Sequence, residues 1–141
     1  MLLLENPNLP LNASISNIKI GYLIFGGKRE FHYSDILQDV DPMTAPVVIW
    51  LQGGPGGSSM FGLLEIHGPF QSVFDGNGNV QAEVNPHAWT KEANVIYIDN
   101  PVGAGFSYSD KLPSTEEEVE NDLYEFLIQW FQLFPQYQVS S

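Results

Sequence analysis

Four glycines and a proline interrupt the chain at residues 53–57, between an apolar run, Val47 to Leu51, and the two serines Ser58 and Ser59. Glycine lets the backbone take positive φ angles and approach a ligand without a Cβ in the way. Serine can cap the first turn of a helix that follows it. A helix that begins there would place unpaired N–H groups beside its positive end. The pattern predicts a cradle for negative charge on oxygen.

Two kinds of chemistry use such a cradle. A nucleotide-binding loop needs Gly-Lys-Ser/Thr after its glycines, but no lysine follows here, and Pro55 breaks the spacing of a dinucleotide-binding loop. The other chemistry is acyl transfer, in which N–H groups stabilise an anionic tetrahedral intermediate, and loss of one donor costs about 2.7–4 kcal/mol. In α/β-hydrolases one donor lies between the third strand and the first helix. A strand-to-helix turn without a ligand is the alternative.

Residues 47–59 resemble the glycine-rich loop of serine carboxypeptidases. Three more segments resemble family motifs in the family's order: residues 65–70, residues 85–108 with Asn-Pro-His-Ala-Trp and Asn-Pro-Val-Gly-Ala-Gly-Phe-Ser, and residues 122–137. Gln52 and Gly57, in place of the commoner Asn and Cys, are similar to the vitellogenic carboxypeptidase-like branch.

The resemblance implies an α/β fold, the N-terminal part of an α/β-hydrolase with a mixed, incomplete sheet. Residues 1–141 would form a single partial domain, with about residues 1–12 as an extended lead-in. The implied activity is that of a serine-type carboxypeptidase, which removes C-terminal residues through an acyl-enzyme. The family's Gly-Glu-Ser-Tyr-Ala-Gly turn is not in the sequence, and the triad order of Ser, Asp and His places all three beyond residue 141. We therefore interpret the chain as an N-terminal fragment and expect it to be inactive alone.

By the same resemblance, the backbone N–H of Gly54 is the oxyanion donor. The side chain of Gln52 and the N–H of Gly53 lie where the family binds the C-terminal carboxylate of its substrate. Glu65 has two interpretations, because the family glutamate falls at the position of Ile66 and one helical step rotates a side chain by about 100°. It is first an exposed helix residue and second a member of the carboxylate site.

Two other functions stay open. The acyltransferase branch of the same scaffold passes the acyl group to an alcohol instead of water. A non-catalytic fragment could instead bind a peptide or partner protein through an exposed strand edge. For the carboxypeptidase, the expected partner is the C-terminus of a peptide or protein, no cofactor is needed, and the oligomeric state is not indicated.

The net charge of the chain excludes some classes of binding partner. A net charge of −12 argues against nucleic acid and anionic membranes as partners.

The three histidines, His32, His67 and His87, lie in different expected elements without ligand spacing, so no metal site is predicted. The chain has no cysteine, so the loop disulfide available to relatives with Cys at the position of Gly57 is absent.

The resemblance also implies a location in the secretory pathway, lysosomal or extracellular. The first four residues are too short for a signal peptide, and no apolar run could span a bilayer. Residues 12–14, Asn-Ala-Ser, form a glycosylation sequon at Asn12 that matters only if the protein is exported, and a chance match is the alternative.

These motifs need a sheet to position them. Alternation and turn residues predict strands at 15–25 and 30–37 around a turn at 26–27, a hairpin at 70–74 and 80–84, and a strand at 94–98. The apolar run 46–51 predicts a strand covered on both faces, followed by a helix at 58–66. A helix at 114–134 would begin with a capping box of Ser114 and Glu117. Without the family's next strand, we expect the strand at 46–51 to have an open edge.

Overall fold

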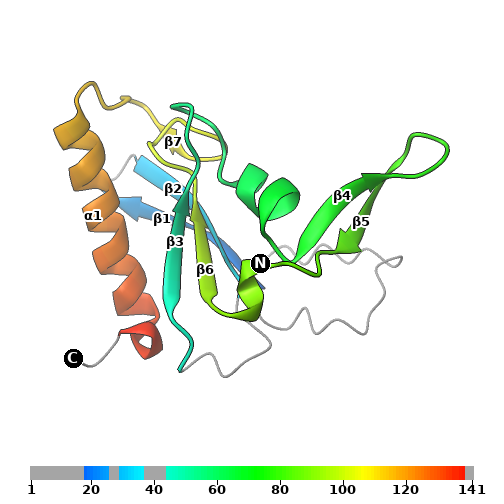
Figure 1. Ribbon diagram of the computed structural model, residues 1–141. Helices are drawn as coiled ribbons and strands as arrows, with labels where there is room; N and C mark the ends of the chain where they lie inside the picture. The colour runs from blue at the N-terminus through cyan, green and yellow to red at the C-terminus, as the bar shows by residue number, and fades with distance from the viewer. Residues whose placement is uncertain (1–17, 26–28, 37–43, 139–141) are drawn as a thin grey trace.

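The computed structural model describes residues 18–25, 29–36 and 44–138. Its main sheet has the order β1 (Ile18–Phe25), β2 (Arg29–Ile36), β6 (Asn94–Ile98) and β3 (Val47–Leu51), with the short strand β7 (Tyr108–Ser109) also paired to β2. β3 and β6 run parallel, whereas the other pairs are antiparallel. The sheet is therefore mixed, as predicted (Figure 1).

β6 lies inside the sheet, and all five of its residues are buried. Successive side chains of a strand point to opposite faces. Ile96 and Ile98 accordingly join one core cluster, and Val95 and Tyr97 join another. The apolar run Val95–Ile98 within β6 thus follows from burial on both faces.

One face of the sheet is covered by α1 (Glu116–Leu133), which is followed by the 3-10 turn η4 (Pro135–Tyr137) (Figure 1). Phe126 and Trp130 of α1 are fully buried in the cluster that contains Ile96 and Ile98. Burying side chains of this size contributes about 1.5–3 kcal/mol each. The partly buried Leu123, Leu127 and Phe134 pack against the same cluster, so the apolar side of this segment faces the sheet.

The start of α1 differs by one residue from the prediction. Thr115, not Ser114, is the N-cap, because Thr115 has the extended backbone of a cap and its side chain accepts a hydrogen bond from the N–H of Glu118. The carboxylate of Glu118 in turn accepts from the N–H of Ser114 at 2.6 Å. Glu118 therefore takes the role that we assigned to Glu117.

The other face carries the short π-helical segment η2 (Gly62–Ile66), the 3-10 turn η3 (Trp89–Lys91), and a separate hairpin of β4 (Phe70–Phe74) and β5 (Val80–Val84). The hairpin projects away from the main sheet (Figure 1). The predicted helix at 58–66 is present and ends where expected, but its helical residues begin at Met60 and its last five form the π-helical η2. The Ser58 hydroxyl accepts a hydrogen bond from the N–H of Met60 at 3.2 Å, as a cap would, and it also donates to the carboxylate of Asp99. The Ser59 hydroxyl donates to the carbonyl of Ile98.

The prediction that both faces of β3 are covered is also wrong. In the described part of the chain, β3 pairs only with β6, and Ile49 and Leu51 are 37% and 39% exposed. Among the described residues, the expected open edge is present at β3.

Three predictions cannot be compared with the structure, because the predicted turn at 26–27, the lead-in at 1–12 and Asn12 lie outside the described residues. Among the helices that the structure describes, none has the length and apolar character needed to cross a membrane.

Candidate functional site

The glycine loop leaves the sheet at the carboxyl ends of the parallel strands β3 and β6. Leu51 and Ile98 are partners in the register of these strands, so Gln52 and Asp99 follow at the same edge. Ligands of open α/β sheets bind outside the carboxyl ends of the strands. This edge is therefore where a site is expected.

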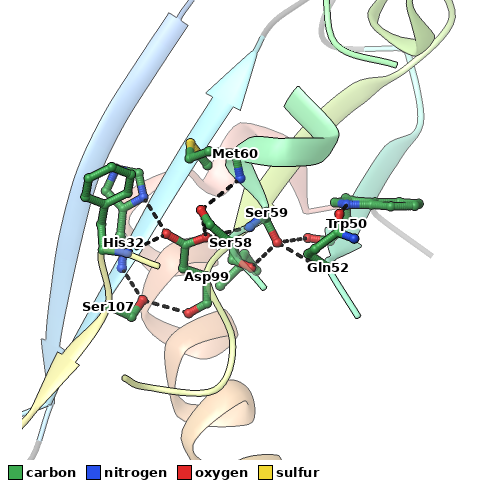
Figure 2. Close-up of polar contacts among 10 residues, drawn as sticks. His32, Trp50, Gln52, Ser58, Ser59, Met60, Asp99 and Ser107 are labelled. Atoms are coloured by element: carbon green, nitrogen blue, oxygen red, sulfur yellow. Dashed lines mark hydrogen bonds and ion pairs between the residues drawn. The ribbon is translucent and has the colours of Figure 1, made fainter. Parts of the chain in front are cut away.

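Both ends of the glycine loop are tied down through Ser59, which is fully buried. The N–H of Gln52, at the start of the loop, donates to the Ser59 hydroxyl oxygen at 3.0 Å. That hydroxyl donates to the carbonyl of Ile98 on β6 at 2.5 Å. The N–H of Ser59, at the end of the loop, donates to the carboxylate of Asp99 at 2.6 Å (Figure 2).

Between these two anchors the loop keeps its N–H groups free. Within the described residues, neither Gly53 nor Gly54 donates a hydrogen bond from its backbone, and both residues are exposed. Gly54 has φ of +145° and Gly56 has φ of +91°, a region that favours glycine. The N–H groups of Gly53 and Gly54 are thus two adjacent donors without an acceptor in the loop. The backbone conformation at Gly54 and Gly56 would be strained for any residue other than glycine.

The side chain of Gln52 is oriented by its neighbour on β3. The indole N–H of Trp50 donates to Oε1 of Gln52 at 3.2 Å. An indole nitrogen is only a donor, so the oxygen and not the nitrogen of the amide must face it. The Nε2 group of Gln52 is left as a pair of donors, and in the described part of the chain it has no partner.

Trp50 is held by aromatic side chains on the η2 side of the sheet. Its ring lies 4.4 Å from the ring of His67, which stacks on Trp89 at 4.0 Å. The Nδ1 atom of His67 is 3.1 Å from the hydroxyl of Tyr97. Burial lowers the pKa of His67 and raises that of Tyr97, so both side chains are neutral. The cluster supports Trp50, and through it Gln52.

A fully buried carboxylate, Asp99, lies behind the loop. Burial opposes its charge, but hydrogen bonds from His32, Phe106, Ser58 and Ser59 outweigh burial and hold the pKa of Asp99 below its ordinary value. Asp99 therefore stays ionised at neutral pH. Sequence reasoning missed it, although a charged residue directly after the apolar run Val95–Ile98 is a signal, because buried charges require partners.

The structure brings some of the predicted site residues together and separates others. The half-buried Gln52 and the exposed Gly53 and Gly54 lie in one turn at the end of β3. Glu65 is exposed on η2, and no hydrogen bond or ion pair joins it to them in the described residues. Its role in the carboxylate site stays a prediction. The same residues contain no group of three or more His, Cys, Asp or Glu that could hold a metal ion.

The sequence is similar to that of known proteins. A profile described as serine carboxypeptidase matches residues 8–141. The chain is 49% identical over 120 residues to the lysosomal protective protein of Mus musculus, covering 84% of this chain and 25% of the mouse protein. It is 50% identical over 102 residues to the probable serine carboxypeptidase CPVL of Homo sapiens, covering 70% of this chain and 21% of that protein. The chain thus spans about a quarter of these relatives.

A solved structure is similar over most of the described fold. Kex1Δp, a prohormone-processing carboxypeptidase from Saccharomyces cerevisiae, matches with a TM-score of 0.75 and 26% sequence identity. The match covers 86% of this chain and 29% of the yeast protein.

Proposed function

Because the chain belongs to the serine carboxypeptidase family, we propose that its glycine loop and Gln52 form the donor half of a carboxypeptidase site. This half binds the C-terminal carboxylate of a peptide and stabilises the anionic oxygen of the transition state. The observation that supports it is the pair of exposed N–H groups at Gly53 and Gly54, which find no acceptor among the described residues.

The N–H of Gly54 acts on the reacting carbonyl. When a serine hydroxyl attacks the last peptide bond, the carbonyl electron pair moves onto oxygen, and the Gly54 N–H donates to it. A histidine takes the proton of the serine and passes it to the leaving amine; water then hydrolyses the acyl-enzyme. The chain contains no Gly-x-Ser-x-Gly segment. We therefore expect no turnover from the 141 residues alone.

Gln52 and Gly53 supply specificity for the end of a peptide. The Nε2 group of Gln52 and the N–H of Gly53 are neutral donors that suit a carboxylate. An internal peptide segment would leave these donors unpaired, at a cost of about 1–3 kcal/mol each. The site therefore prefers a free C-terminus to an internal peptide bond or an amidated end.

The expected partner is thus the C-terminus of a peptide or protein. The proposed location is the secretory pathway, in a lysosome or outside the cell. The name of the mouse relative, lysosomal protective protein, supports this location.

A chimaera tests the proposal. In it, this chain replaces the segment of the mouse lysosomal protective protein that it matches, and the unmodified mouse protein gives the reference rate. We expect release of the C-terminal residue from a blocked dipeptide with a free carboxylate, and much slower release when that carboxylate is amidated. A folded chimaera that cleaves neither dipeptide, while the mouse protein cleaves the free acid, would contradict the proposal.

A further inference from the structure

The carboxylate of Asp99 uses both of its oxygen atoms to hold three segments of the chain together. One oxygen accepts from the N–H of Ser59 at 2.6 Å and from the hydroxyl of Ser58 at 2.8 Å. The other accepts from the N–H of Phe106 at 2.9 Å and lies 3.4 Å from Nδ1 of His32. Figure 2 shows these contacts converging from the glycine loop and from β2.

The backbone around Asp99 is shaped to admit this carboxylate. Gly105 has φ of +53°, and a Cβ there would lie 2.3 Å from the nearer Asp99 oxygen and 2.8 Å from the Cβ of Ser58. A side chain at this position would displace the carboxylate from the serines. Ser107 adds a second link, because its hydroxyl donates to the Asp99 carbonyl at 2.6 Å and accepts from the N–H of His32 at 2.9 Å.

Asp99 therefore anchors one end of the glycine loop, while the hydroxyl of Ser59 anchors the other. The described residues contain no hydrogen bond to the N–H groups of Gly53 or Gly54 that could fix them from within the loop. Their direction depends on the two anchors. Donors that are fixed before the substrate arrives need no reorganisation during the reaction.

We propose that Asp99 is a positioning residue for the Gly53 and Gly54 donors, acting through Ser58 and Ser59 without touching the substrate. This inference rests on the proposed function, since it gives Asp99 a task in that same site. An asparagine at position 99 keeps the shape but offers one acceptor oxygen. Its NH₂ group must then face the donors of either the serines or Phe106, and one side of the anchor is lost.

The test uses the full 141-residue chain with ¹⁵N-labelled glycine, the variant Asp99→Asn, and acetylphenylalanine as a probe with a free carboxylate. We expect the order parameters of the Gly53 and Gly54 amides to fall from about 0.85 to below about 0.6 in the variant. We expect its affinity for the probe to fall about tenfold. Asp122→Asn is the matched control, because Asp122 is another buried aspartate but pairs with Arg29 on β2.

Each outcome decides the question. Asp99→Asn with unchanged order at Gly53 and Gly54 would overturn the inference, as would an equal loss in Asp122→Asn. If the unmodified chain does not bind the probe, the proposed function fails, while the order parameters still decide the role of Asp99. If Asp99→Asn does not fold, Ser58→Ala removes one bond of the anchor. Loosened Gly53 and Gly54 amides in that variant support the inference, and unchanged ones contradict it.

Discussion

The indole N–H of Trp50 donates to the side-chain oxygen of Gln52 at 3.2 Å, and this one bond decides which end of the amide is left for a ligand. Residues two apart on an extended chain lie on the same side, which brings the two side chains together. Trp50 is in turn fixed by its contact with His67, 4.4 Å between ring centres. The aromatic residues around Trp50 thus determine that the side chain of Gln52 presents its NH₂ group, and not its oxygen, to a ligand.

This relationship predicts the effect of Gln52→Glu. The new carboxylate still accepts from Trp50, but its second oxygen replaces the donor group and faces the substrate carboxylate. In the chimaera we expect KM for a free-acid dipeptide to rise on the order of 10- to 100-fold through like-charge repulsion. Steady-state kinetics on free-acid and amidated dipeptides measure it, and an equal rise for both substrates would contradict the assignment.

The N–H of Gly54 is tested by an amide-to-ester substitution at that residue, which replaces the N–H by oxygen and adds no side chain. We expect kcat of the chimaera to fall about 10²- to 10³-fold with little change in KM, because the donor acts mainly in the transition state. The same substitution at Gly56, which is exposed in the same loop, is the control. Equal losses at both positions would assign the effect to loop damage.

Much of the framework follows from the sequence. The mixed sheet of an α/β-hydrolase was predicted, and the likeness to Kex1Δp confirms this fold. The run Val95–Ile98 predicts a strand because it is apolar throughout, as burial on both faces requires, and the helix with Phe126 and Trp130 is predicted by its apolar period. Such elements can be predicted from the local sequence because burial and backbone preference favour the same secondary structure.

The details around the glycine loop could not be predicted in this way. Ser58 and Ser59 have the composition of helix caps, and the Ser58 hydroxyl accepts from the N–H of Met60, yet both hydroxyls also donate to Asp99 and Ile98, which are about 40 residues away in the chain. Only the parallel pairing of β3 with β6 brings these partners together. A residue's preference for a cap is a local property, and it carries no information about the long-range hydrogen bonds that the same hydroxyl donates.

The shifted cap of α1 gives a stability prediction. Thr115→Ala removes the side-chain acceptor for the N–H of Glu118 and should lower the free energy of unfolding by about 1 kcal/mol. Ser114→Ala, the position first expected to be the cap, should cost less, since the Ser114 N–H can still donate to the Glu118 carboxylate. Urea denaturation of both variants measures this, and a larger loss in Ser114→Ala would contradict the assignment.

Asp99 also predicts a dependence of stability on pH. Its pKa is lower in the folded chain than in the unfolded chain, where an aspartate has a pKa of about 3.9. The folded state therefore gains stability above the unfolded pKa and loses it as the pH falls through the folded pKa. Denaturation at several pH values between about 7 and 2 should show this loss.

Other carboxylates titrate in the same range, and Asp75 and Glu118 also have lowered pKa values. The quantity to follow is therefore the difference in unfolding free energy between the unmodified chain and Asp99→Asn. This difference should shrink toward low pH. A difference that stays constant would mean that Asp99 is not the ionised group that the structure indicates.

The open edge of β3 predicts self-association. Ile49 and Leu51 are 37% and 39% exposed there, and unpaired strand edges with apolar side chains recruit other strands. We expect the 141-residue chain to form concentration-dependent oligomers, and Leu51→Lys to suppress them. Phe74→Lys is the matched control, because Phe74 is 76% exposed but lies on the separate hairpin. Sedimentation velocity over a range of concentrations distinguishes the two variants. Equal suppression by both would assign the association to general apolar exposure, and a monomeric unmodified chain would mean that this edge is protected.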